Sequence, residues 1–384
     1  MSFEFASPTR IVFGCGKLAE IGPAARELGR HALVVTGRDP RRATRLRERL
    51  AAVDVAVTDF AIAGEPTTDD IARGTAVAGA GGCDLVIGFG GGSAVDAAKA
   101  IAALLTNGGE LSDYLEVIGR AQPLVRAAAP CIAIPTTGGT GSEVTRNAVL
   151  TSPAHRLKVS LRSVHLLPRI AWVDPELACE LPPAVTASTG LDALTQLIEA
   201  HVSVRANPLT DALCAAGIRR AARSLRRAFT DGWDTTARED MAFASLCSGL
   251  ALANAGLGAV HGFAAPIGGA FSAPHGAICA ALLPHVMAAN LAALRLRAPG
   301  HAALRGYDEI ARLLSGDATA TADEGVHWVA GLVTDLRIPA LGRHGLSPGD
   351  FAPIIAAAAK ASSMKANPIP LTPEELKGIL ESAV

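Results

Sequence analysis

The chain has 384 residues, of which 49% are hydrophobic and 18% charged, and its formal net charge is -1. This length predicts two domains with buried cores, and the composition excludes a disordered chain. The near-zero net charge argues against nucleic acid or an anionic membrane surface as a partner.

Seven cysteines are scattered along the chain, and none belongs to a Cys-X-X-Cys pair. This pattern is typical of reduced, mostly buried thiols and indicates a cytoplasmic protein. The first ten residues lack the basic and apolar regions of a signal peptide, and Ala-rich runs such as 354–360 are too short to cross a bilayer. We therefore expect a soluble protein without a membrane partner.

Short apolar runs alternate with helical segments in the first half of the chain. Such an alternation is typical of a parallel sheet covered by helices on both faces, so this half is predicted to be a Rossmann-like α/β domain. The expected strands are 11–13, 31–36, 53–60, 84–89, 131–135 and 171–175, and the expected helices include 17–28, 41–50 and one capped by Thr67 or Thr68.

A glycine-rich loop follows the expected strand 84–89 and leads into a segment of helical character that starts at Ser93. Glycine lets the backbone approach a ligand closely, and a helix N-terminus attracts phosphate. We interpret the loop as a phosphate-binding site, although Ser93 stands where the strict GxGxxG fingerprint has its last glycine. A tight turn that binds no ligand is the alternative interpretation of this loop by itself.

A second loop, 136–145, follows the expected strand 131–135 and is rich in threonine, glycine and serine. Its hydroxyl groups are suited to bind a pyrophosphate, a ribose or a nicotinamide amide. Because the two loops follow successive strands, we expect both at the edge of the sheet where open α/β folds bind ligands. Together they favour a dinucleotide site over two empty turns.

Long Ala/Leu/Arg segments with helical periodicity replace the strands beyond 181–183 (LPP). We predict an α/β domain over 1–178 and an all-helical domain over 179–384. The expected helices are 184–204, 209–229, 238–260, 276–294, 307–314 and 323–335. This assignment places His261 at the end of one helix and His275 at the start of the next.

Four polar side chains in the second half form a candidate metal site. Asp192 and Gln196 are four residues apart in an expected helix and project from one face. The glycines and the proline between His261 and His275 allow the chain to turn back, so that both imidazoles can reach that face. A carboxylate and two imidazoles suit a divalent transition metal. The alternative is that the histidines are hydrogen-bonded core residues and Asp192 is a helix N-cap.

These motifs, in their order and spacing, resemble the iron-containing (group III) alcohol dehydrogenases over nearly the whole chain. The resemblance rests on residues 90–99 (GGGSAVDAAK), 135–143 (PTTGGTGSE), 190–195 (GLDALT), 260–262 (VHG) and 274–276 (PHG). It implies a dinucleotide-binding α/β domain, a helical domain, and hydride transfer between NAD(P) and an alcohol or aldehyde carbon in the cleft between them.

The resemblance also implies which residues bind the cofactor and the metal. The implied metal is Fe²⁺ or Zn²⁺, held by Asp192, His261 and His275 with Gln196 in the fourth position, and the two histidines are also the expected catalytic residues. The implied cofactor contacts are Gly91, Gly92, Ser93, Asp96, Thr136, Thr137, Thr140, Asn147 and Lys158.

Two positions depart from the family pattern. Gln196 stands where metal-binding relatives usually have histidine, and a neutral amide oxygen is a weaker donor, so we expect reduced metal affinity. Ala265 stands where many relatives have a second histidine as a possible proton relay, and an alanine cannot carry a proton. If metal is absent, as in the metal-independent maleylacetate reductases, His261 and His275 are the leading candidates to stabilise the developing alkoxide.

Gly37 and Arg38 bear on the choice of cofactor. NAD-preferring relatives tend to have an aspartate after the second strand, where this chain has Gly37 followed by Arg38 and nearby arginines. A missing carboxylate with added guanidinium groups accommodates a 2'-phosphate, which favours NADP over NAD. The alternative is that these arginines only solvate a helix face.

The resulting prediction is a cytoplasmic, homodimeric, NAD(P)-dependent alcohol dehydrogenase or carbonyl reductase that interconverts a small alcohol and its aldehyde or ketone. One alternative is a metal-independent, maleylacetate-type reductase of an oxo-acid. Another, from a different class, is a lyase like dehydroquinate synthase, which uses NAD only transiently. Net turnover of NAD(P)H would exclude the lyase.

Overall fold

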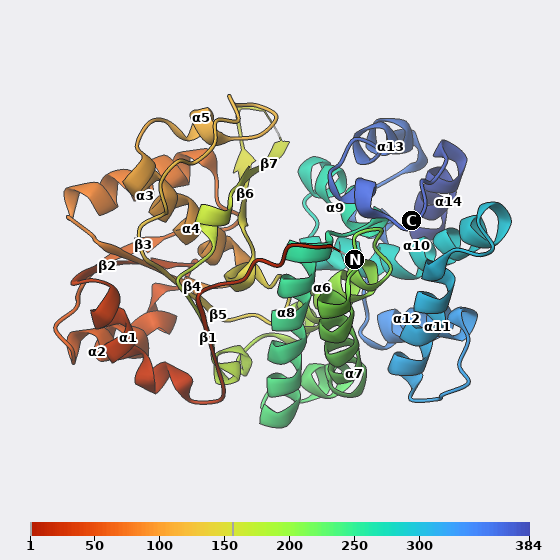
Figure 1. Ribbon diagram of the computed structural model, residues 1–384, viewed down its shortest axis with the longest axis horizontal. Helices are drawn as coiled ribbons and strands as arrows, with labels where there is room; N and C mark the ends of the chain where they lie inside the picture. Colours follow the sequence, from red (N-terminus) through yellow and green to blue (C-terminus); the bar gives the residue numbers. More distant parts are fainter. Residues whose placement is uncertain (1, 156) are drawn as a thin grey trace. The chain divides into compact units, whose positions relative to one another are not determined.

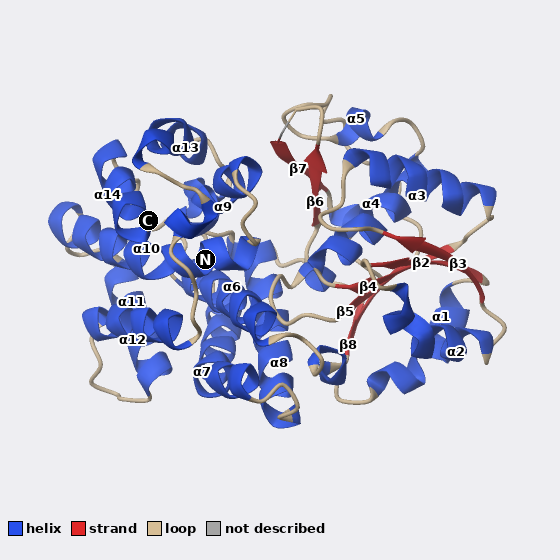
Figure 2. Ribbon diagram, turned by 180° about the vertical axis from the view of Figure 1, so that it is seen from behind, coloured by secondary structure: helices blue, strands red, loops and turns tan. Residues whose placement is uncertain are grey.

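The structure is a computed structural model that describes residues 2–155 and 157–384, which divide into two compact units. The α/β unit consists of Ala6–Thr137 and Gly141–Ala178. The helical unit consists of Cys179–Val384 with Gly138–Thr140 and the start of the chain. Among the described residues, every strand belongs to the α/β unit (Figure 2). The predicted fold class, an α/β half followed by a helical half, is confirmed.

A six-stranded parallel sheet forms the centre of the α/β unit, with the order β1-β8-β5-β4-β2-β3. Its strands are β1 (Arg10–Phe13), β2 (His31–Thr36), β3 (Ala56–Ala61), β4 (Leu85–Gly90), β5 (Cys131–Pro135) and β8 (Ile170–Val173). The expected strand 53–60 begins too early, because the backbone turns at Asp54, which has a φ of 53°. The other expected strands agree with the structure to within two residues.

Helices cover both faces of this sheet (Figure 1). They are α1 (Ile21–Leu28) and α2 (Thr44–Ala51) on one face, with α3 (Thr68–Ala80) and α4 (Gly92–Asn107) on the other. Successive residues of a strand point to opposite faces, so Val34 packs against the first pair while Leu33 and Val35 pack against the second. This double cover explains why the strands consist of continuous apolar runs.

An antiparallel hairpin in the α/β unit was not predicted. It consists of β6 (Asn147–Ser152) and β7 (Leu157–Arg162), and it follows the short helix α5 (Leu111–Tyr114) and β5 in the chain. Its buried residues alternate with exposed or half-buried ones, as in Ala148 and Leu150. This alternation is the signal of a strand buried on one face, and it contains none of the continuous apolar runs from which the other strands were predicted.

The helical unit packs its helices around one hydrophobic core. The helices are α6 (Pro183–His201), α7 (Pro208–Thr230), α8 (Thr235–Ala255), α9 (Ala259–Ala270), α10 (His275–Arg297), α11 (Ala302–Ser315), α12 (Ala322–Asp335), α13 (Phe351–Ala358) and α14 (Pro373–Ala383). By length and hydropathy alone α10 could cross a bilayer, but 78% of its apolar window is buried inside the structure. This burial is typical of a core helix.

The prediction of one helix over 238–260, with His261 at its end, was wrong. α8 ends at Ala255, Gly256 has a φ of 72°, and the chain bends by 99° before α9 begins. His261 therefore lies in the first turn of α9 instead of at the end of α8. The bend depends on distant groups, because the Asn367 side chain accepts the N–H of Ala259 at 3.1 Å.

Candidate functional site

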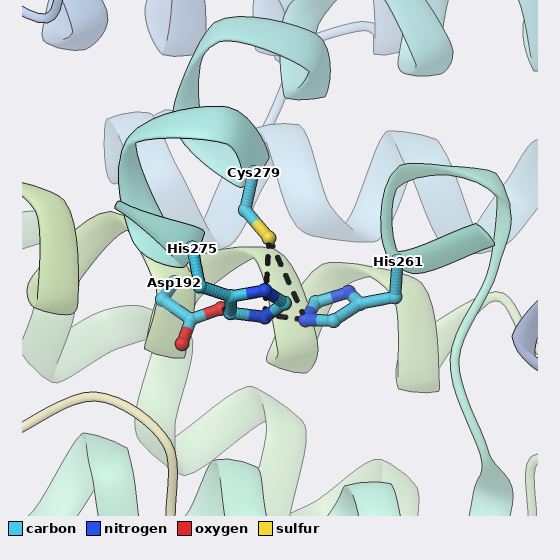
Figure 3. A group of neighbouring side chains, drawn as sticks. All are labelled: Asp192, His261, His275 and Cys279. Atoms are coloured by element: carbon cyan, nitrogen blue, oxygen red, sulfur yellow. Dashed lines mark hydrogen bonds and ion pairs between the residues drawn. The ribbon is translucent and has the colours of Figure 1, made fainter. Parts of the chain in front are cut away.

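Four side chains of the helical unit converge on one point (Figure 3). Asp192 comes from the middle of α6, His261 from the first turn of α9, and His275 and Cys279 from the first two turns of α10. The Oδ1 atom of Asp192 lies 3.3 Å from Nε2 of His261 and 3.8 Å from Nε2 of His275. The Sγ atom of Cys279 lies 3.6 Å from Nε2 of His275 and 3.8 Å from Nε2 of His261.

Local geometry explains how α6 and α10 bring these groups together. His275 and Cys279 are four residues apart, so they share one face of α10. Gly276 lets this end of α10 approach α6, since a Cβ atom there would lie 2.3 Å from the carbonyl oxygen of Ser188. Asp192 lies in the interior of α6, which begins at Pro183, so its interpretation as an N-cap is wrong.

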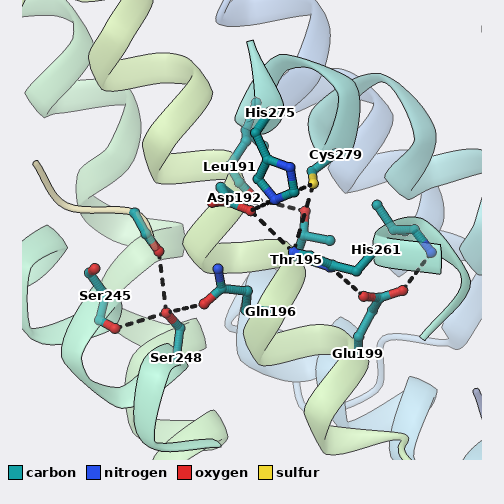
Figure 4. Close-up of polar contacts among 12 residues, drawn as sticks. Leu191, Asp192, Thr195, Gln196, Glu199, Ser245, Ser248, His261, His275 and Cys279 are labelled. Atoms are coloured by element: carbon teal, nitrogen blue, oxygen red, sulfur yellow. Dashed lines mark hydrogen bonds and ion pairs between the residues drawn. The ribbon is translucent and has the colours of Figure 1, made fainter. Parts of the chain in front are cut away.

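Glu199 orients His261 (Figure 4). One Glu199 carboxylate oxygen lies 2.6 Å from Nδ1 of His261, and the other accepts the N–H of Val260 at 2.7 Å. A proton on Nδ1 leaves the lone pair of Nε2 facing Asp192 and Cys279, which is the usual arrangement of a metal-binding imidazole. Sequence analysis missed this role, although Glu199 follows Asp192 by seven residues and therefore lies on the same helical face.

The cluster has the properties of a cation site. The Oδ1 atom of Asp192 is buried and accepts no hydrogen bond of good geometry from any described residue. The nearest nitrogen, Nε2 of His261, lies 3.3 Å away, and in the neutral ring with its proton on Nδ1 it offers this oxygen no donor. A buried polar atom without a partner is costly. A carboxylate, two imidazoles and a thiol around one point therefore suit a divalent transition metal.

Opposite charges shift the pKa values within the cluster. Burial opposes ionisation of Asp192, but His275 and His261 hold its pKa below the ordinary value. Burial also disfavours the charged form of His261, but Cys279, Asp192 and Glu199 raise its pKa well above the usual range. Cys279 and then Asp192 likewise raise the pKa of His275. A metal ion must compete with protons on these imidazoles, so its binding is expected to weaken at low pH.

Gln196, the predicted fourth ligand, lies one turn after Asp192 on α6 and is buried. Its amide oxygen lies 2.9 Å from the hydroxyl oxygen of Ser248, which also lies 2.8 Å from the carbonyl oxygen of Ser245 (Figure 4). The amide oxygen of Gln196 thus has a hydrogen-bond partner within the protein. Ala265, which stands at the expected proton-relay position, lies in α9 with an exposed methyl group.

The phosphate-loop candidate lies between β4 and α4 in the α/β unit. Gly90 has a φ of 159°, and a Cβ atom there would lie 2.7 Å from Cβ of Ala94, so glycine is required on both counts. Gly91 precedes the first turn of α4 and provides no side-chain cap. The N–H groups of that turn, which includes Gly92 and Ser93, are therefore suited to bind an anion.

Two further loops adjoin this one at the carboxyl edge of the sheet. The N–H of Thr136, after β5, donates to the carbonyl oxygen of Gly90 at 2.8 Å. The backbone nitrogen of Gly37, after β2, would lie 3.6 Å from a Cβ atom at Gly90. The chain passes from β2 to β3 in one direction along the sheet and from β4 to β5 in the other. A reversal of this kind, here between β2 and β4, is where open α/β sheets bind ligands.

Several predicted cofactor residues have partners within the protein. Asp96 accepts hydrogen bonds from Ser142 and from the N–H of Val149, and its carboxylate lies 2.9 Å from Nζ of Lys99. The remaining contacts are Lys158 with Glu65 at 2.6 Å, Arg38 with the carbonyl oxygen of Ala63 at 3.0 Å, and Asn147 through its carbonyl oxygen with Lys99. Thr137 lies beside Gly91, whereas Thr140 belongs to the helical unit.

Glu143 is a buried carboxyl group that sequence analysis did not identify. It lies in a short 3₁₀ turn after β5 and is 2% exposed. Burial raises its pKa to about 7, while a backbone hydrogen bond and the charge of Lys99 act in the opposite direction. Loss of solvation therefore dominates at this position.

Known proteins with similar sequences and structures give a consistent family assignment. The family model "Iron-containing alcohol dehydrogenase" matches residues 8–175, and "Fe-containing alcohol dehydrogenase family, C-terminal" matches residues 186–384. The chain is 36% identical to 1,3-propanediol dehydrogenase of Klebsiella pneumoniae over 390 residues, which cover 99% of this chain and 98% of that protein. It is 37% identical to the NAD-dependent methanol dehydrogenase of Bacillus methanolicus over 329 residues, covering 84% and 83%. The crystal structure of a 1,3-propanediol oxidoreductase matches with a TM-score of 0.93 and 33% identity over 100% of both chains.

Proposed function

The chain belongs to the iron-containing alcohol dehydrogenase family, and from this premise we propose which of its residues bind the cofactor and the metal. The protein is an oxidoreductase that interconverts an alcohol and its aldehyde or ketone, with a nicotinamide dinucleotide, NAD or NADP, as the hydride carrier. The observation that supports the site assignment most directly is that His261 and His275 converge on Oδ1 of Asp192, a buried oxygen without a hydrogen-bond partner among the described residues.

The pyrophosphate of the cofactor binds at the start of α4 in this proposal. The N–H groups around Gly92 and Ser93 donate to phosphate oxygens, and the positive end of the α4 dipole adds to the attraction. Thr136 and Thr137, in the adjoining loop, supply hydroxyl groups for the ribose or the nicotinamide amide. The proposed cofactor contacts also include Asp96, Asn147 and Lys158, each of which is held by a neighbouring group of the α/β unit.

A divalent cation, Fe²⁺ or Zn²⁺, is held by Asp192, His261 and His275, with Gln196 as the predicted fourth residue. When bound, the cation supplies a Lewis acid that polarises the substrate oxygen. Glu199 keeps the proton of His261 on Nδ1, so that Nε2 remains a ligand. His275 completes the imidazole pair, and because it is more exposed than His261 it is the histidine better placed to meet the substrate.

The open space after β2 supports the use of NADP. A Cβ atom at Gly37 would meet nothing within 4 Å, and the side chain of Arg38 is exposed and held by the carbonyl oxygen of Ala63. A 2'-phosphate thus finds room and a nearby guanidinium group. Initial rates with NADPH should equal or exceed those with NADH, and a strong preference for NADH would refute this part of the proposal.

The substrate class follows from the relatives, whose names specify 1,3-propanediol and methanol. We propose a small aliphatic alcohol, acted on by a cytoplasmic homodimer. The test is NAD(P)H oxidation with a series of small aldehydes, together with elemental analysis before and after treatment with a chelator. Analytical ultracentrifugation checks the dimer. No net turnover of cofactor with any aldehyde would overturn the activity, and full activity without bound metal would overturn the ligand assignment.

A further inference from the structure

We propose that Cys279 is the fourth protein ligand of the metal, so that the donor set is Asp192, His261, His275 and Cys279. This inference rests on the metal-dependent function proposed above and specifies the chemistry of that site. Gln196 on α6 would be a weak donor in the fourth coordination position, and this inference assigns that position to a residue on α10. A thiol that loses its proton to solvent as the sulfur–metal bond forms restores the number of strong donors to four.

The interatomic distances match a tetrahedral site. For Zn²⁺, ligand bonds of about 2.3 Å to sulfur and about 2.1 Å to nitrogen place the two donor atoms about 3.6 Å apart, and nitrogen and oxygen donors about 3.4 Å apart. The Sγ atom of Cys279 lies 3.6 Å and 3.8 Å from the two imidazole nitrogens, and Oδ1 of Asp192 lies 3.3 Å and 3.8 Å from them. All four donor atoms lie within 4.8 Å of one another.

The orientation of the neighbouring groups favours Cys279 over Gln196. Cys279 follows His275 by one helical turn, and in Figure 3 its sulfur points toward both imidazoles. The amide oxygen of Gln196 has the hydroxyl group of Ser248 as a partner at 2.9 Å. The Oδ1 atom of Asp192 has no comparable partner among the described residues, and it belongs to the group of converging donor atoms that includes Sγ of Cys279.

A sulfur donor changes which metal the site prefers. A thiolate is softer than an amide oxygen and adds a second negative charge to that of Asp192, so the site favours Zn²⁺ or Co²⁺ over Fe²⁺. The departure at Gln196 then changes the type of metal that is bound without abolishing metal binding. The sequence contains all of these residues, but only the fold brings Cys279 together with Asp192, His261 and His275.

The test uses the full-length protein, freed of metal by a chelator and titrated with Co²⁺. A thiolate ligand produces a sulfur-to-cobalt charge-transfer band in the near ultraviolet, which oxygen and nitrogen ligands do not give. The wild-type protein should show this band at one Co²⁺ per chain. Cys279→Ala and Cys279→Ser should lose it and bind Co²⁺ at least about tenfold more weakly, since even loss of a group behind a ligand costs this much.

Two control variants make the assignment specific. Cys214→Ala removes a cysteine that is equally buried in α7 but outside the cluster, and it should keep both the band and the affinity. Gln196→Ala should also keep the band. A wild-type protein without the band, a band that survives in Cys279→Ala, or a loss of affinity confined to Gln196→Ala would each overturn the proposal.

The proposal remains testable if the Cys279 variants fail to fold. X-ray absorption of the zinc-loaded wild-type protein should then show one sulfur at about 2.3 Å, and spectra fitted by nitrogen and oxygen alone would overturn it. Aldehyde reduction by the same wild-type preparation is measured in parallel. An active enzyme without a sulfur ligand refutes only the role of Cys279, whereas an inactive protein with a sulfur ligand refutes only the proposed activity.

Discussion

The two units build their candidate sites from different parts of the chain. In the α/β unit, the phosphate-loop candidate consists of backbone groups from a few consecutive residues around Gly90 and the first turn of α4. In the helical unit, the candidate metal site consists of side chains from α6, α9 and α10, which lie in the sequence between residues 192 and 279. A backbone site depends on conformation, so it tolerates side-chain changes that a side-chain cluster does not.

The largest effect is expected at the side-chain cluster. Asp192→Asn removes the charged oxygen that faces both imidazoles, so kcat/KM should fall by about a thousandfold or more, together with the metal content. Asp323→Asn, the same change at an exposed ion pair with Arg295, is the control and should leave both unchanged. Steady-state kinetics and elemental analysis measure the effect. Normal activity in Asp192→Asn would contradict the assignment of the cluster.

Glu143 is a buried carboxyl group of the α/β unit, and its titration is expected to change the stability of the protein. Its folded pKa of about 7 exceeds the ordinary glutamate value of 4.5, so the folded state binds the extra proton and the native protein loses stability as pH rises through this interval. Glu143→Gln should therefore exceed the wild type in unfolding free energy by on the order of 3 kcal/mol above pH 7 and by little near pH 4.

Denaturant unfolding of both proteins across this pH range measures the difference. A constant difference at every pH would show that Glu143 does not titrate in this interval.

The dependence of the phosphate loop on backbone conformation predicts a sharp contrast between two glycines. Gly90→Ala places a Cβ atom 2.7 Å from that of Ala94 at a φ of 159°, so the protein should lose about 2 kcal/mol of stability and bind the cofactor more weakly. Gly79→Ala, at an exposed helical position of α3 with open space around it, should instead be neutral or slightly stabilising.

Thermal unfolding and cofactor titration compare the two variants. Equal behaviour of the two would remove the basis for calling the loop a backbone site.

The smallest effect is expected at Glu199, which contacts the proposed metal ligand His261. Glu199→Gln keeps the shape of the side chain but lowers its power to hold the proton on Nδ1 of His261, so metal affinity should fall by at least about tenfold. Glu309→Gln, which changes the exposed partner of His201, serves as the control. Metal competition assays measure the affinity, and an unchanged value would mean that Glu199 only supports the backbone at Val260.

Local patterns in the sequence were sufficient for most of the fold and for the phosphate loop. The apolar runs predicted the parallel sheet, and the cap predicted at Thr67 or Thr68 marked the start of α3, whose N-cap is Thr67. Glycines at a strand-to-helix junction predicted a loop of the kind found at Gly90. These features depend on neighbours within about one turn of chain, so they are accessible without a tertiary structure.

Tertiary contacts decided the arrangement of the candidate metal site. The break before α9 depends on Asn367, more than a hundred residues away. Because of this break, His261 lies at the start of α9 and not at the end of the preceding helix, where the sequence predicted it. Cys279 resembled a buried thiol with no special role until the fold placed its sulfur beside two imidazoles. The sequence alone determined which donor types the chain carries. Only the packing of α6, α9 and α10 decided which of them meet, because donor atoms a few ångströms apart belong to helices that no local pattern relates.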